Sequence, residues 1–385
     1  MNEFKYQPKL RTFLNPRNVA IAVLAAVYLY TVFFTYIHNR NSEGYILGDW
    51  LINYQDGGFK RRGLSGSFFF LLQDFTGLSL NVLVFTFQLF VISFFFFTFY
   101  RIIKEKHISW LYLSLILSSV GFVGLLNNVS YVGKKEFILF AIFAYYCLLI
   151  QQKKLTATKE WLICLLLFLS VLMHEIVLFF IPYFLMARYF SGGRTVDYLK
   201  LIAAVFLPSA AILLFGHQIN EGQSIEILKN RGVIFHDGIF FWDIDEKQIL
   251  IDRFQHFFPY FAAFAFSMLH VYYYLRKEMK NHKRIGLALV VSFLYSLPLF
   301  YLGLDWGRWL YVHMMMAIIL FAGLLPSAKS ITENRQLLHH EKIAVPILII
   351  IFSLIYRVEL SGLFTFEGLF YRVFIVPKEL LDKML

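Results

Sequence analysis

The chain has 385 residues, of which 59% are hydrophobic, 19% aromatic and only 16% charged, and its mean hydropathy is +0.62. These values exclude an ordinary soluble protein, in which about a quarter of the residues are charged. The formal net charge of +11 would suggest nucleic-acid binding in a soluble chain. In a membrane protein, however, basic residues first report the side on which a loop lies. We therefore expect membrane lipids, and no nucleic acid, as partners.

A membrane-spanning helix needs about 20 mostly apolar residues, and eleven runs approach that length. The sequence therefore predicts an all-α, polytopic transmembrane helical bundle of about 11 spans, built as a single integral membrane domain over residues 1–385. The basic N-terminal segment has no small-residue cleavage site, so we expect it to lead straight into the first span. The runs cover residues 18–38, 79–103, 109–126, 136–151, 160–173, 175–190, 199–217, 256–275, 285–304, 309–325 and 343–360.

The apolar stretch 160–190 is interrupted only by His174 and Glu175, so it could form one long tilted helix or two short ones. We favour two, because one helix would bury both polar residues at mid-bilayer. With eleven spans and a cytoplasmic N-terminus, basic residues dominate the cytoplasmic loops and acidic residues dominate the opposite side. This asymmetry follows the positive-inside rule and predicts a periplasmic C-terminus.

Two segments between the predicted spans, 39–78 and 218–255, are longer than simple connections need to be, and long loops often carry function. In the first external loop, the spacing of Tyr45, Trp50 and Tyr54 predicts a short amphipathic helix in the membrane interface. In the second long external loop, Asp237, Asp243 and Asp245 could bind a metal, but a solvated acidic loop is the commoner explanation. We predict no metal site, and the sequence indicates no cofactor.

Polar residues near the ends of the predicted spans map to one side of the membrane. Ionisable groups in such positions are costly and are usually paired or functional. We therefore expect a site on this side. The clusters are Gly48-Asp49-Trp50, residues 56–63, Asn127-Asn128, Lys134-Lys135-Glu136, His174-Glu175 and residues 305–309.

The segment Asp56-Gly-Gly-Phe-Lys-Arg-Arg-Gly is the strongest local signal. Its glycines permit close approach of the backbone to a ligand, and Lys60, Arg61 and Arg62 are suited to a phosphate or diphosphate. The alternative is a loop whose cations contact ordinary lipid phosphates. Lys135 belongs to the same set of candidate substrate-binding cations.

Asp305 and Arg308 lie three residues apart at the junction of two predicted spans, so their side chains could pair on one helical face. Arg308 could hold a phosphate, Asp305 could orient a sugar hydroxyl, and Trp306 could stack on a sugar ring. An interfacial ion pair within an aromatic belt is the equally weighted alternative.

General-base chemistry needs a carboxylate within reach of an acceptor hydroxyl. Asp49 and Asp56 are the first candidates because they lie beside the cations of the first external loop. His174 and Glu175 are further catalytic candidates, although a buried hydrogen bond to a lysine or arginine explains them as well. The pair lacks the second histidine of a His-Glu-x-x-His zinc motif.

The layout resembles bacterial polytopic membrane glycosyltransferases of the GT-C type and the related O-antigen or capsule repeat-unit polymerases of the Wzy kind. The resemblance lies in one span followed by an external loop with Gly48-Asp49-Trp50, then ten more spans with polar groups gathered outside. It implies a polyprenyl-linked sugar donor, a catalytic acidic residue at Asp49 or Asp56, and external arginines at Arg61, Arg62 and Arg308.

From this resemblance we expect a glycosyltransferase at the outer face of the bacterial inner membrane, acting in surface polysaccharide biosynthesis. It would transfer or polymerise sugars from polyprenyl-phosphate or diphosphate-linked donors and could contact other polysaccharide-assembly proteins. The alternatives are a transporter or flippase of lipid-linked glycans and a non-catalytic assembly partner. A transporter is expected to carry charges near the bilayer midplane and related halves, which the sequence does not display.

Overall fold

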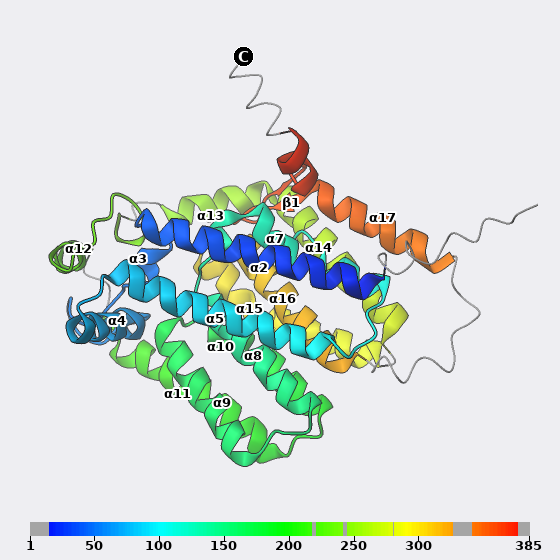
Figure 1. Ribbon diagram of the computed structural model, residues 1–385, viewed down its shortest axis with the longest axis horizontal. Helices are drawn as coiled ribbons and strands as arrows, with labels where there is room; N and C mark the ends of the chain where they lie inside the picture. The colour runs from blue at the N-terminus through cyan, green and yellow to red at the C-terminus, as the bar shows by residue number, and fades with distance from the viewer. Residues whose placement is uncertain (1–14, 218–220, 242–244, 280, 326–340, 376–385) are drawn as a thin grey trace, which may run out of the picture.

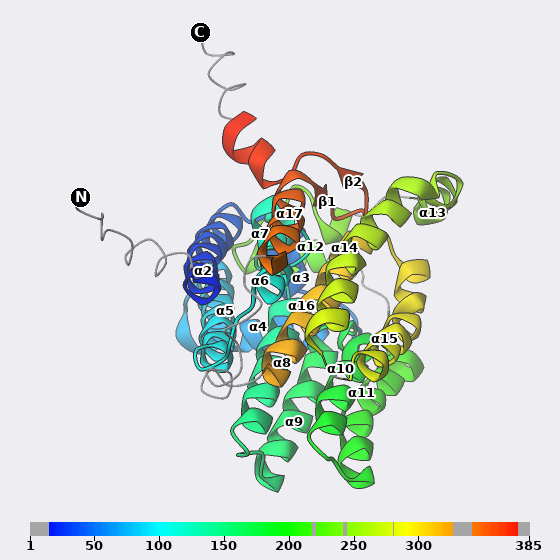
Figure 2. The same cartoon turned by 90° about the vertical axis from the view of Figure 1, so that its right-hand side faces the viewer.

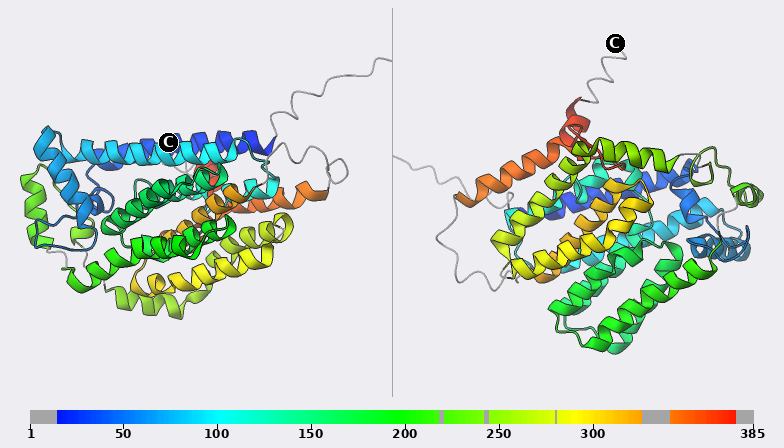
Figure 3. Two further views of the ribbon diagram at one scale, coloured as in Figure 1. Left: turned by 90° about the horizontal axis from the view of Figure 1, so that it is seen from below. Right: turned by 180° about the vertical axis from the view of Figure 1, so that it is seen from behind.

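The computed structural model describes residues 15–217, 221–241, 245–279, 281–325 and 341–375. These residues form a mainly helical protein in which the longer helices run side by side (Figure 3). Ten of the eleven predicted spans coincide with a single helix. These helices are α2 (Pro16–Arg40), α5 (Leu80–Ile103), α8 (Glu136–Gln151), α9 (Ala157–Met173), α10 (Val177–Phe190), α11 (Thr195–Phe215), α14 (Phe257–Glu278), α15 (His282–Leu302), α16 (Trp306–Leu324) and α17 (Glu341–Ile355).

Five of the described helices, α2, α5, α11, α15 and α16, are long and apolar enough to cross a membrane. Helices α8 and α10 are apolar but shorter, as is the stretch Ala344–Ile355 of α17. The described residues therefore contain five candidate membrane spans by length and composition, and the predicted figure of about 11 stays a prediction.

The predicted span 109–126 is instead two short helices, α6 (Trp110–Ile116) and α7 (Phe122–Asn127). The backbone leaves the helical path between them, where the Ser118 hydroxyl accepts a hydrogen bond from the Val120 amide. A serine that bonds its neighbouring backbone in this way competes with the helical ladder. Hydropathy alone reports the apolar run and does not register this interruption.

The first long loop differs from its prediction. Residues 45–54 contain only one helical turn, α3 (Leu47–Trp50), whose four residues are all buried. The longer helix of this segment is α4 (Gly63–Thr76), which exposes Phe68, Leu71 and Phe75. Of the aromatic residues at 45–54, only Trp50 packs into the core, whereas Tyr45 is exposed, and α4 has the exposed apolar side chains expected of an interfacial helix.

The second long loop contains two helices, α12 (Glu221–Asn230) and α13 (Glu246–Gln255), and a short 3₁₀ turn over Ile239–Phe241. Asp243 lies outside the described residues. Asp237 accepts a hydrogen bond from the Gly44 amide, and Asp245 caps α13 by accepting one from Gln248. Figure 1 shows α3, α4 and α12 gathered at one end of the molecule.

The stretch 160–190 forms two helices, as favoured from the sequence. Helix α9 ends at Met173, and His174 takes an extended conformation (φ −161°, ψ 110°) before α10 begins at Val177. The two helices therefore place His174 and Glu175 at one end, and Glu160 and Arg188 at the other.

Helix α16 lies in the interior of the bundle (Figure 2). Of its most apolar stretch 89% is buried, against 17–44% for the other four candidate spans. Its first turn is held by a small antiparallel hairpin, β1 (Arg357–Val358) and β2 (Phe364–Thr365), because the Gly307 amide donates to the Leu360 carbonyl. The start of α16, which carries Arg308, is thus fixed from outside the bundle.

Candidate functional site

Arg62 joins two carboxylates that are far apart in sequence. Its Nε donates to both oxygens of Glu175 at 3.0 and 2.9 Å, and its Nη2 donates to Glu175 Oε1 at 2.6 Å. Its Nη1 donates to Asp49 Oδ1 at 3.0 Å. The neighbouring Arg61 approaches Glu175 only to 3.9 Å. One guanidinium therefore connects the turn at α3 to the junction between α9 and α10.

Arg308 makes a second arrangement of the same kind. Its Nε donates to Glu136 Oε1 at 2.5 Å, and its Nη2 also contacts that oxygen. Its Nη1 donates to Asp305 Oδ2 at 2.9 Å, so the predicted pairing of Asp305 with Arg308 is present. This second group joins the start of α8 to the start of α16.

His174 connects the two groups. Its Nε2 lies 3.0 Å from Arg308 Nη2, and its Nδ1 lies 3.6 Å from Glu175 Oε2. Because a guanidinium only donates, Nε2 accepts, and the proton of a neutral His174 sits on Nδ1, which faces Glu175. Lys135 adds a further link, with its Nζ 3.7 Å from Asp49 Oδ2 and 3.0 Å from the Met173 carbonyl.

We call the connected set the site network. It joins four cations, four carboxylates and one histidine from five chain segments. Its members are Asp49, Arg61, Arg62, Lys135, Glu136, His174, Glu175, Asp305 and Arg308.

The backbone around Arg62 has an unusual conformation and is closely packed. This residue has φ 65°, a left-handed conformation that is uncommon outside glycine, at the start of α4. A Cβ at Gly63 would overlap the Tyr54 ring, and one at Gly66 would overlap the carbonyls of Leu51 and Ile52. The glycines of the predicted anion loop thus allow α4 to pack closely against the extended segment 51–54.

The turn before α8 is tied to α3 through one carbonyl. The Gly133 oxygen accepts hydrogen bonds from Trp50 Nε1 at 2.8 Å and from Gln88 Nε2 at 2.7 Å. Gln88 accepts in turn from Asn39 at 2.6 Å. These buried contacts set Asp49 and Lys135 beside each other.

Neighbouring cations keep Asp49 and Glu175 ionised. Burial would raise the pKa of Asp49, but Lys135 and Arg62 together hold it well below the usual value. Burial would likewise raise the pKa of Glu175, which Arg62 holds far below its usual range. For Lys135, burial dominates and lowers the pKa to about 8, although Asp49 opposes it. At neutral pH the site is thus an array of charges with one lysine close to losing its proton.

The network has a buried side and an open side. Glu136 and Lys135 are inaccessible, with 3% and 0% of their side chains exposed. Arg61 and Asp305 are exposed to 58% and 31%. A ligand can therefore reach Arg61, Asp305 and the edges of Arg62 and Glu175. Glu136 is buried below these groups and is not accessible to a ligand.

Three of the predicted site residues, Asp56, Lys60 and Trp306, lie outside the network. Asp56 pairs with Lys60 four residues later and also accepts from the Ser224 hydroxyl, and both charged side chains are completely buried. The Phe59 carbonyl accepts from the His217 amide. This pair joins the first long loop to the end of α11 and to α12, so its geometry is that of a structural contact and does not support the expected roles in catalysis and phosphate binding.

Trp306 faces an aromatic cluster. Its ring packs edge-on against Tyr260 and Phe254, its Nε1 donates to the Phe300 carbonyl, and the guanidinium of Arg253 lies 5.3 Å from its ring centre. These contacts anchor the segment before Arg308 and occupy the ring, so stacking on a sugar stays a prediction.

Glu136 is the member that we did not single out from the sequence as a candidate site residue. It was visible only as the third residue of Lys134-Lys135-Glu136, and its distance from Arg308 along the chain gives no local signal. In the described part of the chain, no group of three or more His, Cys, Asp or Glu side chains is arranged to hold a metal ion.

No family model, curated protein or solved structure matches this chain.

Proposed function

We propose that the protein is a membrane glycosyltransferase that transfers or polymerises sugars from polyprenyl-phosphate or diphosphate-linked donors. We place it at the outer face of the bacterial inner membrane, in surface polysaccharide biosynthesis. The observation that carries the proposal is the Arg62 guanidinium held between Asp49 and Glu175, partly exposed and next to the open Arg61. Planar guanidinium groups suit a phosphate leaving group, and an adjacent ionised carboxylate suits an acceptor hydroxyl.

Arg61 and Arg62 would bind the donor phosphate. Arg61 holds Glu175 only loosely, so it can turn toward a phosphate without breaking a close ion pair. Negative charge grows on the phosphate oxygen as the bond to the anomeric carbon breaks, and the two guanidinium groups stabilise that charge. Arg308 and Lys135 would add to the positive potential from beneath.

Asp49 would act on the acceptor. The acceptor hydroxyl oxygen forms the new bond to the anomeric carbon, its proton passes to Asp49, and the phosphate leaves with the bonding electrons. The low pKa of Asp49 makes it a weak base while Arg62 is paired with it. A donor phosphate that binds Arg62 in place of Asp49 would raise the pKa of Asp49. Asp49 would then be a stronger base when the acceptor hydroxyl loses its proton.

One observation favours the alternative of a transporter or flippase. In the interior of the bundle, His313 of α16 contacts the Tyr183 hydroxyl at 2.9 Å and the Ser296 hydroxyl at 2.8 Å. Buried histidines within candidate spans often mark transport paths. A transporter would need these three residues, whereas a glycosyltransferase would need Asp49 and Arg62. A non-catalytic assembly partner would need neither.

The test compares surface glycan in cells that carry Asp49→Asn, Arg62→Ala or His313→Phe, with membrane insertion and protein level verified. Asp197→Asn is the matched control, because Asp197 is an equally ion-paired carboxylate at the opposite end of α10. The proposal predicts loss of glycan for Asp49→Asn and Arg62→Ala only. Normal glycan in both site variants would reject it, and loss with His313→Phe alone would favour transport.

A further inference from the structure

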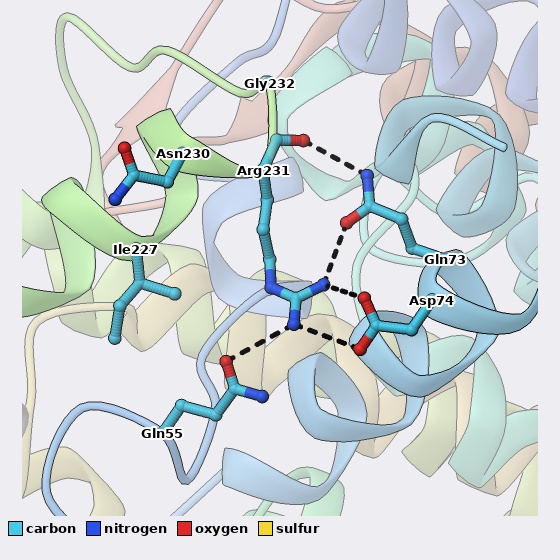
Figure 4. Close-up of a pocket in the computed structure, with 7 residues that line it drawn as sticks. All are labelled: Gln55, Gln73, Asp74, Ile227, Asn230, Arg231 and Gly232. Carbon is cyan, nitrogen blue, oxygen red and sulfur yellow. Dashed lines mark hydrogen bonds and ion pairs between the residues drawn. The ribbon is translucent and has the colours of Figure 1, made fainter. Parts of the chain in front are cut away.

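A second polar pocket lies away from the site network. It has a volume of about 570 Å³ and is formed by the 51–62 loop, the last turn of α4 and the end of α12 (Figure 4). Arg62 precedes the first residue of α4, and Gln73 and Asp74 lie in its last turn. Since a helix rises about 1.5 Å per residue, the pocket is about 16 Å from Arg62. The lining residues are Gln55, Gln73, Asp74, Ile227, Asn230, Arg231 and Gly232.

The charge in this pocket is already balanced. Arg231 pairs with both oxygens of Asp74, at 2.8 and 3.2 Å, and its guanidinium lies 4.2 Å from the centre of the Phe70 ring. The amide of Gln73 accepts from the same guanidinium at 3.1 Å and donates to the Arg231 carbonyl at 3.1 Å. A phosphate would have to displace Asp74 to reach Arg231, so the pocket disfavours an anion.

Two carboxamides remain available. The Gln55 oxygen lies 3.5 Å from Arg231, which leaves its N–H groups without a partner in the described part of the chain. The Asn230 side chain makes no hydrogen bond to any described residue, and Figure 4 shows it on the far side of Arg231 from Asp74. Ile227 lies one turn before Asn230 and offers an apolar surface. Free amides, an exposed carboxylate and an apolar wall match the hydroxyls and C–H faces of a sugar.

We propose that this pocket binds a neutral carbohydrate, as a holding site for the glycan that is extended at the site network. The role as a holding site rests on the proposed function, but the binding itself does not. The separation of about 16 Å, estimated from the helical rise over α4, suits a short oligosaccharide and exceeds a single sugar. The Arg231 and Asp74 pair would then orient a chain that reaches back along α4 toward Arg62.

The test measures binding by saturation-transfer NMR to the full chain in nanodiscs. The probes are oligosaccharides released by mild acid from the envelope of the native cells, with inorganic diphosphate as the anionic comparison. Asn230→Ala and Gln55→Ala should each weaken oligosaccharide binding about tenfold, as expected for loss of a hydrogen bond to the ligand. Lys229→Ala, a neighbour that does not line the pocket, should bind as the wild type does.

The two proposals fail separately. Oligosaccharide binding that is absent from the wild type, or unchanged in Asn230→Ala and Gln55→Ala, would overturn the pocket assignment whatever Asp49→Asn does. Diphosphate binding that is lost in these two variants would also overturn it. If Asp49→Asn leaves surface glycan intact while the pocket variants lose oligosaccharide binding, the pocket assignment stands and the transfer site is wrong.

Discussion

The site network has a counterpart at the opposite ends of α9 and α10. There, Glu160, Arg188, Arg194, Asp197 and Lys200 form a second cluster of ion pairs, which we call the Arg188 network. Both clusters mix arginine, lysine and carboxylates, and both contain buried acidic side chains. Composition therefore does not distinguish a functional cluster from a structural one.

Connectivity distinguishes them. Four of the five members of the Arg188 network fall within residues 188–200, and Asp197 accepts from the Arg194 amide to cap α11. Helix capping and the closing of one short turn account for the contacts among these four residues, and Glu160 of α9 adds ion pairs to Arg188 and Lys200. The site network instead joins five distant segments, uses a left-handed Arg62 to do so, and leaves Arg61 open. None of the helices α3, α4, α8, α10 and α16 has a side-chain capping hydrogen bond at its N-terminus, so N-capping does not account for this arrangement, which favours a ligand.

The largest expected effect concerns stability. Arg308→Met removes the guanidinium that contacts the buried Glu136 directly, which should lower the free energy of unfolding by about 3–5 kcal/mol. Arg188→Met should cost about half as much, because Lys200 remains 3.3 Å from Glu160 and 3.6 Å from Asp197. Thermal unfolding of the purified variants measures both. Equal losses would erase the difference between the networks, and Glu136→Gln added to Arg308→Met should recover much of the loss.

The next effect concerns activity. Arg62→Lys keeps the charge but removes the paired contacts to Glu175 and the contact to Asp49. Sugar transfer should fall about 10- to 100-fold, since a lysine cannot reproduce the planar contacts. Arg188→Lys should stay within about twofold of the wild type. A comparison of initial transfer rates decides, and a wild-type rate for Arg62→Lys would contradict the assigned role.

Lys135 should contribute to the pH dependence of stability. Its pKa falls from 10.5 to about 8 on folding, mainly because it is buried. Between these values the unfolded chain binds more protons than the folded one, so this group makes the free energy of unfolding rise with pH. The rise is at most about 1.4 kcal/mol per pH unit. The free energy of unfolding of the wild type minus that of Lys135→Met should therefore grow from pH 8 to 10.5, with the wild type minus Lys200→Met as the control difference. A difference that does not change with pH would contradict the assignment.

The smallest effect belongs to the capping carboxylate. Asp197→Ala removes the hydrogen bond to the Arg194 amide, a cap worth about 1 kcal/mol, together with the ion pairs to Arg188 and Lys200. Sugar transfer per folded molecule should not change. A selective loss of transfer in this variant would show that the Arg188 network also takes part in function.

Hydropathy predicted the positions of most helices because burial in an apolar bundle needs only the right density of apolar residues. It failed at 109–126, where the hydroxyl of Ser118 bonds the backbone between α6 and α7. The spacing of aromatic residues predicted a helix at 45–54, where the structure has one turn with Trp50 buried and Tyr45 exposed, and the exposed apolar helix is α4.

Much of the site could be predicted for a simple reason. Charged residues at the ends of apolar helices need partners of opposite charge. The sequence predicted that such residues gather on one side, and Asp49, Arg62, Glu175 and Arg308 belong to one connected network. Asp56 and Lys60 had the same local signal but satisfied each other at a spacing of four residues. A single sequence does not show which cations form a buried ion pair with a nearby carboxylate. It also does not show that Glu136 pairs with Arg308.

The most direct measurement is sugar transfer by the purified chain in nanodiscs, from a radiolabelled polyprenyl-diphosphate-linked donor to a glycan acceptor. We predict transfer by the wild type and by Asp197→Asn, and a rate at least about 100-fold lower for Asp49→Asn, consistent with loss of a general base. Transfer by Asp49→Asn at the wild-type rate, or none by the folded wild type with its native donor and acceptor, would contradict the account.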